Sequence, residues 1–285
     1  MKTIKQAVLS GERALFKAQN LRIEDSVFLD GESPLKESSN LELVNDIFRW
    51  KYPLWYSNFL EAENITLTET ARSGIWYSHH LEIKHSLIQA PKTFRRASNI
   101  HLEDVQLPNA EETFWNCQQI TLNNVQATGD YFAMNSQDIK ADQFTISGNY
   151  AFDGAKNIEI SNARILSKDA FWNCENVVVR DSVIIGEYLG WNSKNIKLIN
   201  CLVESNQGMC YMKNLEMIDC KIVNTDLAFE YSTVQVSTDS VIESIKNPLA
   251  GKIQAAAIEE IIFDDSAIDF SQTKLSLGNE NQVAL

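Results

Sequence analysis

The hydrophobic and polar positions of this chain repeat with a period close to nineteen residues. A polar residue, most often Asn, precedes an apolar–x–apolar triplet. The triplets begin at Leu21, Leu41, Ile65, Leu81, Ile100, Ile120, Ile139, Ile158, Val177, Ile196, Leu215 and Val234, and the last six spacings are all nineteen residues. Such short alternating runs are typical of strands, so the pattern predicts a solenoid whose coils contribute short parallel strands.

The length of the repeat narrows the choice of solenoid. A unit of nineteen residues is too short for a strand–helix–strand unit, which needs about thirty residues. We therefore expect an all-β fold, a single-stranded right-handed parallel β-helix of about twelve coils, because parallel crossovers prefer that hand. The predicted parts are an N-terminal cap over 1–13, the β-helix over 14–249 and a C-terminal cap over 250–285, all in one domain.

Fixed positions relative to the triplets form columns that should stack from coil to coil. The residue before the triplet is Asn in eight of twelve cases, which indicates a left-handed corner where the side-chain amides can form a ladder. Six residues before the triplet lies an inward column, which contains Phe59, Phe94, Phe114, Phe152 and Phe171. The next residue should point outward, and that column includes Leu60, Trp76, Arg95, Trp115, Asp153, Trp172, Trp191 and Cys210.

Composition limits the class of partner. The net charge of −13 argues against a general nucleic-acid binder and against docking on an anionic membrane. The sequence shows no transmembrane span and no secretory signal, and its five cysteines include no CxxC pair, so we expect a reduced, cytoplasmic protein. The sequence predicts no cofactor, and no metal site, since no His pair recurs at one column of neighbouring coils.

Two segments, FWNCENVVVRDSVI (171–184) and YLGWNSKNIKLINCLV (188–203), resemble the coils of known proteins. They look like pectate-lyase-like right-handed β-helices and are more similar to a bacterial β-helix family catalogued only as a domain of unknown function. The wider superfamily implies polysaccharide lyases, hydrolases and esterases. Its polygalacturonase motifs and its calcium-binding Asp cluster are not found in this sequence, so no activity carries over residue by residue.

The outward tryptophans and their neighbours are the predicted ligand-binding residues. An outward stripe of aromatic rings and amides is typical of sugar binding. The stripe comprises Trp76, Tyr77, Arg95, Arg96, Trp115, Asn116, Trp172, Asn173, Trp191 and Asn192. Two interpretations remain open: a groove for a carbohydrate or another anionic small ligand, or tryptophans that belong to the core or lie under a loop. The alternative function is a non-catalytic scaffold whose stripe docks a partner or a second copy of the chain.

Three aspartates are the candidate catalytic residues. Asp130, Asp153 and Asp169 come from successive predicted coils near the stripe, and a glycosidase needs two carboxylates about 5–10 Å apart. Acidic residues are abundant, so a pair of this kind also arises by chance. The sequence therefore leaves open whether the protein is an enzyme; a lyase or a glycoside hydrolase would be the expected class.

Three further features qualify the picture. The segment 48–59, FRWKYPLWYSNF, lies in an apparent 24-residue coil and is either an overhang of the binding face or a small satellite core. All four histidines fall between His79 and His101, among several Lys and Arg residues, which indicates either an anion site or solvated charge. Cys201 and Cys220 are nineteen residues apart, so their thiols should stack.

Overall fold

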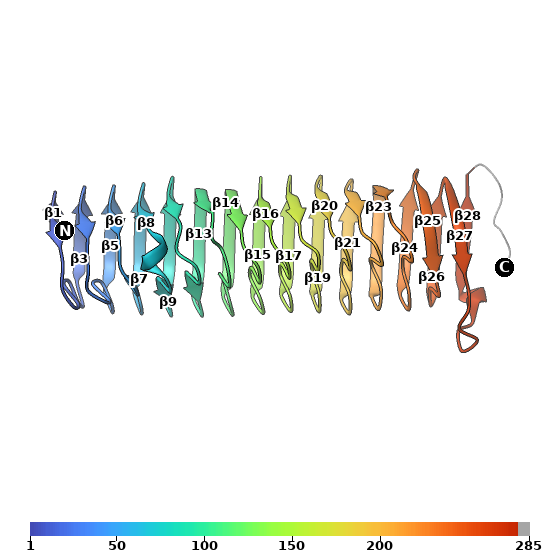
Figure 1. Cartoon of the computed structure of the whole chain (residues 1–285), viewed down its shortest axis with the longest axis horizontal. Coiled ribbons are helices and arrows are strands. Elements are labelled where there is room, and N and C mark those ends of the chain that lie inside the picture. The colour runs from blue at the N-terminus through green and yellow to red at the C-terminus, as the bar shows by residue number, and fades with distance from the viewer. Residues whose placement is uncertain (279–285) are drawn as a thin grey trace. The chain divides into compact units, whose positions relative to one another are not determined.

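The protein, seen here in a computed structural model that describes residues 1–278, is a parallel β-solenoid of about fifteen turns. It divides into two compact units, Met1–Ser147 and Gly148–Leu285. In Figure 1 the coils of each unit follow one another as short strands that lie side by side. The described residues contain only two short 3-10 segments, η1 (Glu69–Ala71) and η2 (Phe270–Gln272), and no helix among them could span a membrane.

The first unit carries eight strands at the triplet positions. They are β1 (Lys2–Lys5), β3 (Gln19–Glu24), β5 (Ser39–Val44), β7 (Asn58–Glu63), β10 (His79–Lys84), β13 (Ser98–Leu107), β14 (Gln118–Thr128) and β15 (Gln137–Asp142). A second side of the coils holds β2 (Val8–Leu9), β4 (Val27–Phe28), β6 (Ile47–Phe48), β8 (Thr66–Leu67), β11 (Leu87–Ile88) and β16 (Thr145–Ser147). A separate pair, β9 (Ile75–Trp76) and β12 (Phe94–Arg95), carries part of the stripe.

The described part of the second unit, residues 148–278, carries seven strands at the triplet positions. They are β17 (Lys156–Ser161), β19 (Glu175–Arg180), β21 (Lys194–Ile199), β23 (Lys213–Val223), β24 (Thr233–Thr238), β26 (Ala250–Ala255) and β28 (Thr273–Leu277). The other strands are β18 (Arg164–Leu166), β20 (Val183–Ile185), β22 (Leu202–Glu204), β25 (Val241–Lys246) and β27 (Ala257–Ile262). Within each unit the paired strands run parallel, as the repeat predicts.

The coil count exceeds the expected twelve because strands also form near both ends. Residues 2–5, which lie in the predicted N-terminal cap, form β1, and β1 pairs in parallel with β3. Residues 273–277 form β28, which pairs with β26 inside the segment assigned to the C-terminal cap. Residues 279–285 of that predicted cap lie outside the described residues.

One coil of the predicted register is wrong. Strand β7 aligns Leu60 with Leu41 on one side and with Leu81 on the other, so its triplet begins at Leu60 and not at Ile65. The polar residue Asn64, which suggested Ile65, belongs to the opposite corner of the coil, where its Nδ2 donates a hydrogen bond to Asn45 Oδ1 at 2.7 Å. The apparent 24-residue coil thus resolves into ordinary spacings on both sides of Leu60.

This correction reverses the orientation of two side chains. Leu60, predicted to point outward, is buried, whereas Phe59, predicted to fill the core, is 55% exposed. Leu54 takes the inward position in that coil and is fully buried, and Trp55 follows it in the outward column. The segment 48–59 is therefore neither a long insertion nor a separate core, because its residues occupy the ordinary columns of the coil.

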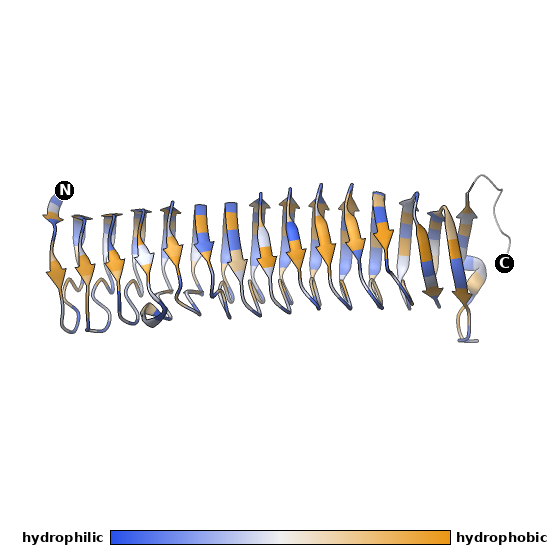
Figure 2. Cartoon of the chain, turned by 45° about the horizontal axis from the view of Figure 1, so that its top comes forward, coloured by the Kyte–Doolittle hydropathy of each residue, from blue (hydrophilic) through white to orange (hydrophobic). Residues whose placement is uncertain are grey.

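The other inward phenylalanines confirm the predicted core. Phe94 and Phe114 are buried with ring centroids 4.5 Å apart and an interplanar angle of 10°. In the second unit Phe152 and Phe171 are buried and stack at 5.3 Å. Figure 2 shows the apolar and polar bands that alternate along the strands, as expected when one side of each strand packs inward. Stacked rings at equivalent positions thus fill the interior coil by coil.

The corner residues confirm the predicted amide ladder. In the second unit Asn176 Nδ2 donates to Asn157 Oδ1 at 3.1 Å, and Asn195 and Asn214 continue the same pattern at 2.9 and 3.0 Å. The backbone is left-handed there, with φ of 60° at Asn176 and 56° at Asn195. Asn tolerates this conformation better than most residues, so one residue type satisfies both the corner and the ladder.

A buried carboxyl group interrupts the interior of the first unit. Asp46 is fully buried; its Oδ1 accepts a hydrogen bond from the Ser26 backbone N–H at 2.8 Å, and its Oδ2 has no partner within the described residues. Burial raises the pKa of this carboxyl from 3.8 to about 6. Because burial disfavours the carboxylate, Asp46 destabilises the folded chain progressively as the pH rises from about 4 through 6.

We expect Phe114→Ala to lower the free energy of unfolding by about 3–5 kcal/mol, because it leaves a cavity in the ring stack. Denaturant unfolding of the variant beside the parent chain measures this loss. Val8→Ala, at a side chain that is 70% exposed, is the control and should change little. Equal effects of the two substitutions would contradict the stacked core.

We expect Asp46→Ser to stabilise the protein above pH 6 by about 2–3 kcal/mol, because it removes a buried carboxylate whose pKa is raised. Ser26 and Ser86, at the equivalent positions of nearby coils, show that Ser fits this column. Thermal unfolding between pH 4 and pH 8 should show the gain at high pH shrinking toward pH 4. A gain that does not depend on pH would show that the charge of Asp46 is not the cause.

Candidate functional site

The predicted stripe of the first unit is a continuous stack of rings and one guanidinium group. Trp76 on β9 stacks on Trp55 at 5.2 Å and 8°. The guanidinium of Arg95 on β12 lies 4.5 Å from the Trp76 ring centroid and 4.6 Å from that of Trp115. The parallel bridge between Arg95 and Trp115 holds these residues in register. The stripe thus includes Trp55, which is absent from the predicted stripe because the predicted register of that coil is wrong.

The indole N–H groups of the stripe are all bonded to backbone carbonyls. Trp76 Nε1 donates to Lys92 O at 2.7 Å, and Trp115 Nε1 donates to Tyr131 O at 2.7 Å. In the second unit Trp172 and Trp191 donate to carbonyls sixteen residues ahead in the same way. Each tryptophan is half-buried, so the column does lie at the surface, but the rings tie one coil to the loop of the next.

Arg95 is committed to groups of this chain. Its two faces lie against Trp76 and Trp115, and its Nη2 lies 3.2 Å from Glu112 Oε2, which also accepts from Lys92 Nζ at 3.0 Å. A guanidinium between two rings gains cation–π stabilisation on both faces. A ligand carboxylate at Arg95 would therefore compete with Glu112.

The column beside the stripe is more exposed. The Tyr56 and Tyr77 rings stack at 4.8 Å and 8°, Arg96 lies 5.9 Å from the Tyr77 centroid, and Lys36 lies 5.6 Å from that of Tyr56. Tyr56 is 48% exposed, and Asn116 continues the same column at the surface. The ring faces again contact each other, so mainly ring edges and cationic side chains meet the solvent.

The second unit repeats this arrangement. Trp172 and Trp191 stack at 5.8 Å and 9°. Asn192 Nδ2 donates to Asn173 Oδ1 at 2.8 Å, and Asn173 Nδ2 donates to Asp153 Oδ1 at 2.8 Å. Asp153, Asn173 and Asn192 thus form an amide ladder beside the two indoles.

The three candidate carboxylates lie in different surroundings. Asp130 is exposed in the first unit. In the second unit, Asp153 is half-buried and accepts the Asn173 amide, and Asp169 is buried. Burial is the main cause of a raised pKa at Asp169, although Lys168 opposes it, and Glu187 and Asp153 add to the increase. A catalytic role for these carboxylates stays a prediction.

The histidines serve local contacts on separate strands and corners. His79 Nδ1 lies 2.7 Å from Ser98 Oγ, His80 Nδ1 lies 2.8 Å from Asn58 Oδ1, His85 Nδ1 lies 3.2 Å from Asp104 Oδ2, and His101 Nε2 lies 3.1 Å from Asn123 Nδ2. Within residues 1–278, no group of three or more His, Cys, Asp or Glu residues could hold a metal ion.

All five cysteines are buried free thiols. The columns placed Cys210 outward, and this is wrong: its side chain is fully buried and its thiol lies 3.3 Å from Gln207 O. Cys201 and Cys220 occupy equivalent positions of neighbouring coils, and the Lys221 backbone N–H donates to Cys201 O at 2.8 Å. Interaction between the two thiols raises the pKa of Cys201 and lowers that of Cys220.

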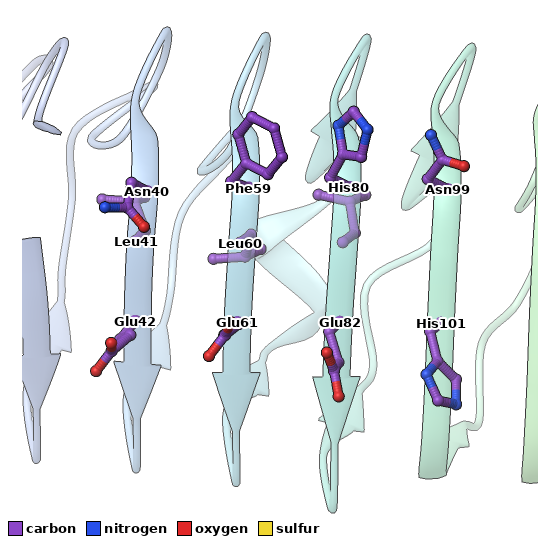
Figure 3. Close-up of a pocket in the computed structure, with 11 residues that line it drawn as sticks. Asn40, Leu41, Glu42, Phe59, Leu60, Glu61, His80, Glu82, Asn99 and His101 are labelled. Atoms are coloured by element: carbon purple, nitrogen blue, oxygen red, sulfur yellow. The ribbon is translucent and has the colours of Figure 1, made fainter. Parts of the chain in front are cut away.

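A hollow that sequence analysis missed lies on the outer face of β5, β7, β10 and β13. It encloses about 460 Å³, and Figure 3 shows Phe59 and His80 on one side of it, with Asn40 and Asn99 on the flanking strands. The Phe59 and His80 rings stack at 4.5 Å and 15°, and this pair interrupts the amide column. We call this hollow the Phe59 groove. A nineteen-residue step from Leu41 would have placed Phe59 at the surface and revealed it.

A row of glutamates crosses the Phe59 groove. Glu61 aligns with Glu42 on one neighbouring strand and with Glu82 on the other, and Figure 3 shows the three side chains at the same level. Arg22 Nη1 lies 2.5 Å from Glu42 Oε2, and Lys84 Nζ lies 2.8 Å from Glu82 Oε1. Lys84 lowers the pKa of Glu82, which keeps that carboxylate charged. Glu61 has no ion pair or hydrogen bond within the described residues.

A family model described as "Protein of unknown function (DUF3737)" matches residues 2–276. The chain belongs to this family. The resemblance to a β-helix family without an assigned function is thereby confirmed. DUF3737 itself names no activity, and no curated protein matches the chain.

Solved structures that match this DUF3737 chain share little sequence with it. The periplasmic alginate epimerase AlgG is 6% identical, over 96% of this chain and 75% of its own, with a TM-score of 0.35. An exopolygalacturonase from Thermotoga maritima is 10% identical, and the match covers 98% of this chain and 93% of that enzyme, with a TM-score of 0.33. The fluoroquinolone resistance protein QnrB1 is 15% identical, and the match covers 69% of this chain and 93% of QnrB1, with a TM-score of 0.30. Likenesses at this level carry no argument about function.

We expect Trp115→Ala to destabilise the protein by about 2 kcal/mol, through lost ring burial and lost contact with Arg95. An outward ring without such contacts would cost little stability when removed. A double-mutant cycle with Arg95→Gln, followed by urea unfolding, should give a coupling of about 1 kcal/mol. Additive effects of the two substitutions would show that the ring–guanidinium contact contributes nothing.

Proposed function

We propose that the protein binds a carbohydrate in the Phe59 groove. The observation that carries the proposal is the Phe59 side chain, which is 55% exposed beside a hollow of about 460 Å³. An exposed aromatic ring offers a flat surface to the apolar face of a sugar. A hollow of this size falls within the range of small-ligand sites.

The polar residues of the groove suit sugar hydroxyls. Asn40 and Asn99 flank the ring pair, and the carboxylates of Glu42, Glu61 and Glu82 follow further along the strands. Amides donate and accept hydrogen bonds, whereas carboxylates accept them from hydroxyl groups. A sugar stacked on Phe59 would therefore find acceptors on three adjacent strands.

The predicted stripe supports carbohydrate binding less strongly. The Trp76 ring has Trp55 against one face and Arg95 against the other, so a sugar could not stack there without displacing them. The exposed Tyr56 and Arg96 beside the stripe are a second place where a glycan could bind.

A non-catalytic scaffold is the second candidate function. The bonded indole N–H groups favour it, because they give the tryptophans a structural role. A scaffold of this kind would dock a partner or a second copy of the chain without binding glycans. Glycan binding therefore separates the two candidates.

A matched pair of substitutions tests the location of the site. Phe59 and Tyr56 are both exposed, both have a left-handed backbone conformation, and both stack on a ring of the next coil. Only Phe59 lines the groove. Asn occurs in the column of each residue, so Phe59→Asn and Tyr56→Asn should both fold. We expect Phe59→Asn to weaken glycan binding about tenfold, through loss of about 1.4 kcal/mol of stacking, and Tyr56→Asn to leave it unchanged.

A glycan array with the parent chain selects the oligosaccharide, and titration calorimetry gives the dissociation constants. Loss of binding in Tyr56→Asn alone would move the site to the column beside the stripe. An array on which the folded parent chain retains no glycan would contradict carbohydrate binding and favour the scaffold.

A further inference from the structure

The charges of the Phe59 groove are not balanced within the chain. Glu42 and Glu82 are held by Arg22 and Lys84, whereas Glu61 between them has no cationic partner in the described structure. The second hollow on this face, of about 200 Å³, shares Glu42, Glu61 and Glu82 with the groove and includes Arg22 and Lys84 in its lining. The cations of this face are thus already engaged, and one carboxylate at its centre is not.

The position of Glu61 relative to Phe59 is fixed by the strand. The two residues are two apart on β7, with the buried Leu60 between them, so both side chains leave the same face about 7 Å apart along the strand. Figure 3 shows the Phe59 ring and the Glu61 carboxylate on that face. A sugar ring stacked on Phe59 can therefore direct a substituent toward Glu61.

The chemical groups that such a substituent could carry differ in how well they complement the Glu61 carboxylate. A carboxylate, as in a uronic acid, would meet the row of glutamates and be repelled. A neutral hydroxyl would donate one hydrogen bond to Glu61 but leave its charge unpaired. An ammonium group would form a charge-assisted hydrogen bond and neutralise the carboxylate.

We propose that the ligand of the Phe59 groove is a glycan with a free amino group, a hexosamine unit whose ammonium pairs with Glu61. This inference rests on the proposed carbohydrate binding and names the class of sugar. It also reverses the sign expected from the sequence, where the cationic residues between 72 and 101 suggested an anionic ligand. Lys84, Lys92 and Arg95 of that group are paired with glutamates of the chain.

Two oligosaccharides that differ only at the nitrogen test the inference. A β-1,4-linked glucosamine tetramer carries free amino groups, and the N-acetylglucosamine tetramer of the same linkage does not. We expect the parent chain to bind the glucosamine tetramer at least tenfold more tightly in titration calorimetry. The preference should disappear at alkaline pH, where the amine of the sugar loses its proton.

Two glutamine variants separate a specific ion pair from general attraction to an acidic protein. Glu61→Gln and Glu63→Gln each remove one negative charge from exposed positions of β7, but only Glu61 lines the Phe59 groove. We expect Glu61→Gln to lose the preference for the free amine and Glu63→Gln to keep it. Equal losses in both variants would show long-range attraction and overturn the inference.

The remaining outcomes distinguish this inference from the proposed function. Equal binding of the two tetramers by the parent chain, lost in Phe59→Asn, would overturn the amine preference and leave carbohydrate binding in place. Binding of neither tetramer, with another glycan retained on the array, would also overturn the amine preference alone. Retention of no glycan at all would overturn both.

Discussion

The stacking of equivalent residues in adjacent parallel strands is the constraint on which the rest of the structure depends. Parallel pairing without a shift places each side chain about 4.8 Å from its counterpart in the next coil. Like residues then contact like residues: Phe94 stacks on Phe114, Asn195 bonds to Asn176, and Trp172 stacks on Trp191. The same spacing that fills the core closes the faces of the surface rings, so most outward aromatics contact each other and few remain free for a ligand.

The sequence predicts the fold well because the repeat reports this constraint directly. Nineteen-residue spacings fix the register from Ile120 to Val234, and strands β14 to β24 lie where the triplets begin within each unit. The register fails at β7, where Phe59 replaces the corner Asn and Asn64 offers a competing signal from the opposite corner. Both corners require a left-handed residue and favour Asn, so a single Asn cannot identify which corner it occupies.

The candidate site is harder to predict, for the same reason. The Phe59 groove departs from the repeat at corner positions that most other coils fill with Asn. Phe59 and His80 are such a departure, and they fall in the coil where the period is least regular. The regular Trp76, Trp115 and Trp172 are easier to find in the sequence, but their indoles are committed to neighbouring groups.

The amide ladders have a direction. Each ladder bond runs from the Nδ2 of an Asn to the Oδ1 of the residue one coil earlier. An interior member therefore both donates and accepts, whereas the first member only accepts. A carboxylate cannot donate, so Asp can occupy only that first place. Ladders that begin with Asp include Asp25 before Asn45, Asp104 before Asn124, Asp153 before Asn173, and Asp181 before Asn200. The order of Asp and Asn along a column therefore has a fixed direction, with Asp before Asn in the chain. An Asp placed inside a ladder would end one chain of bonds and start another.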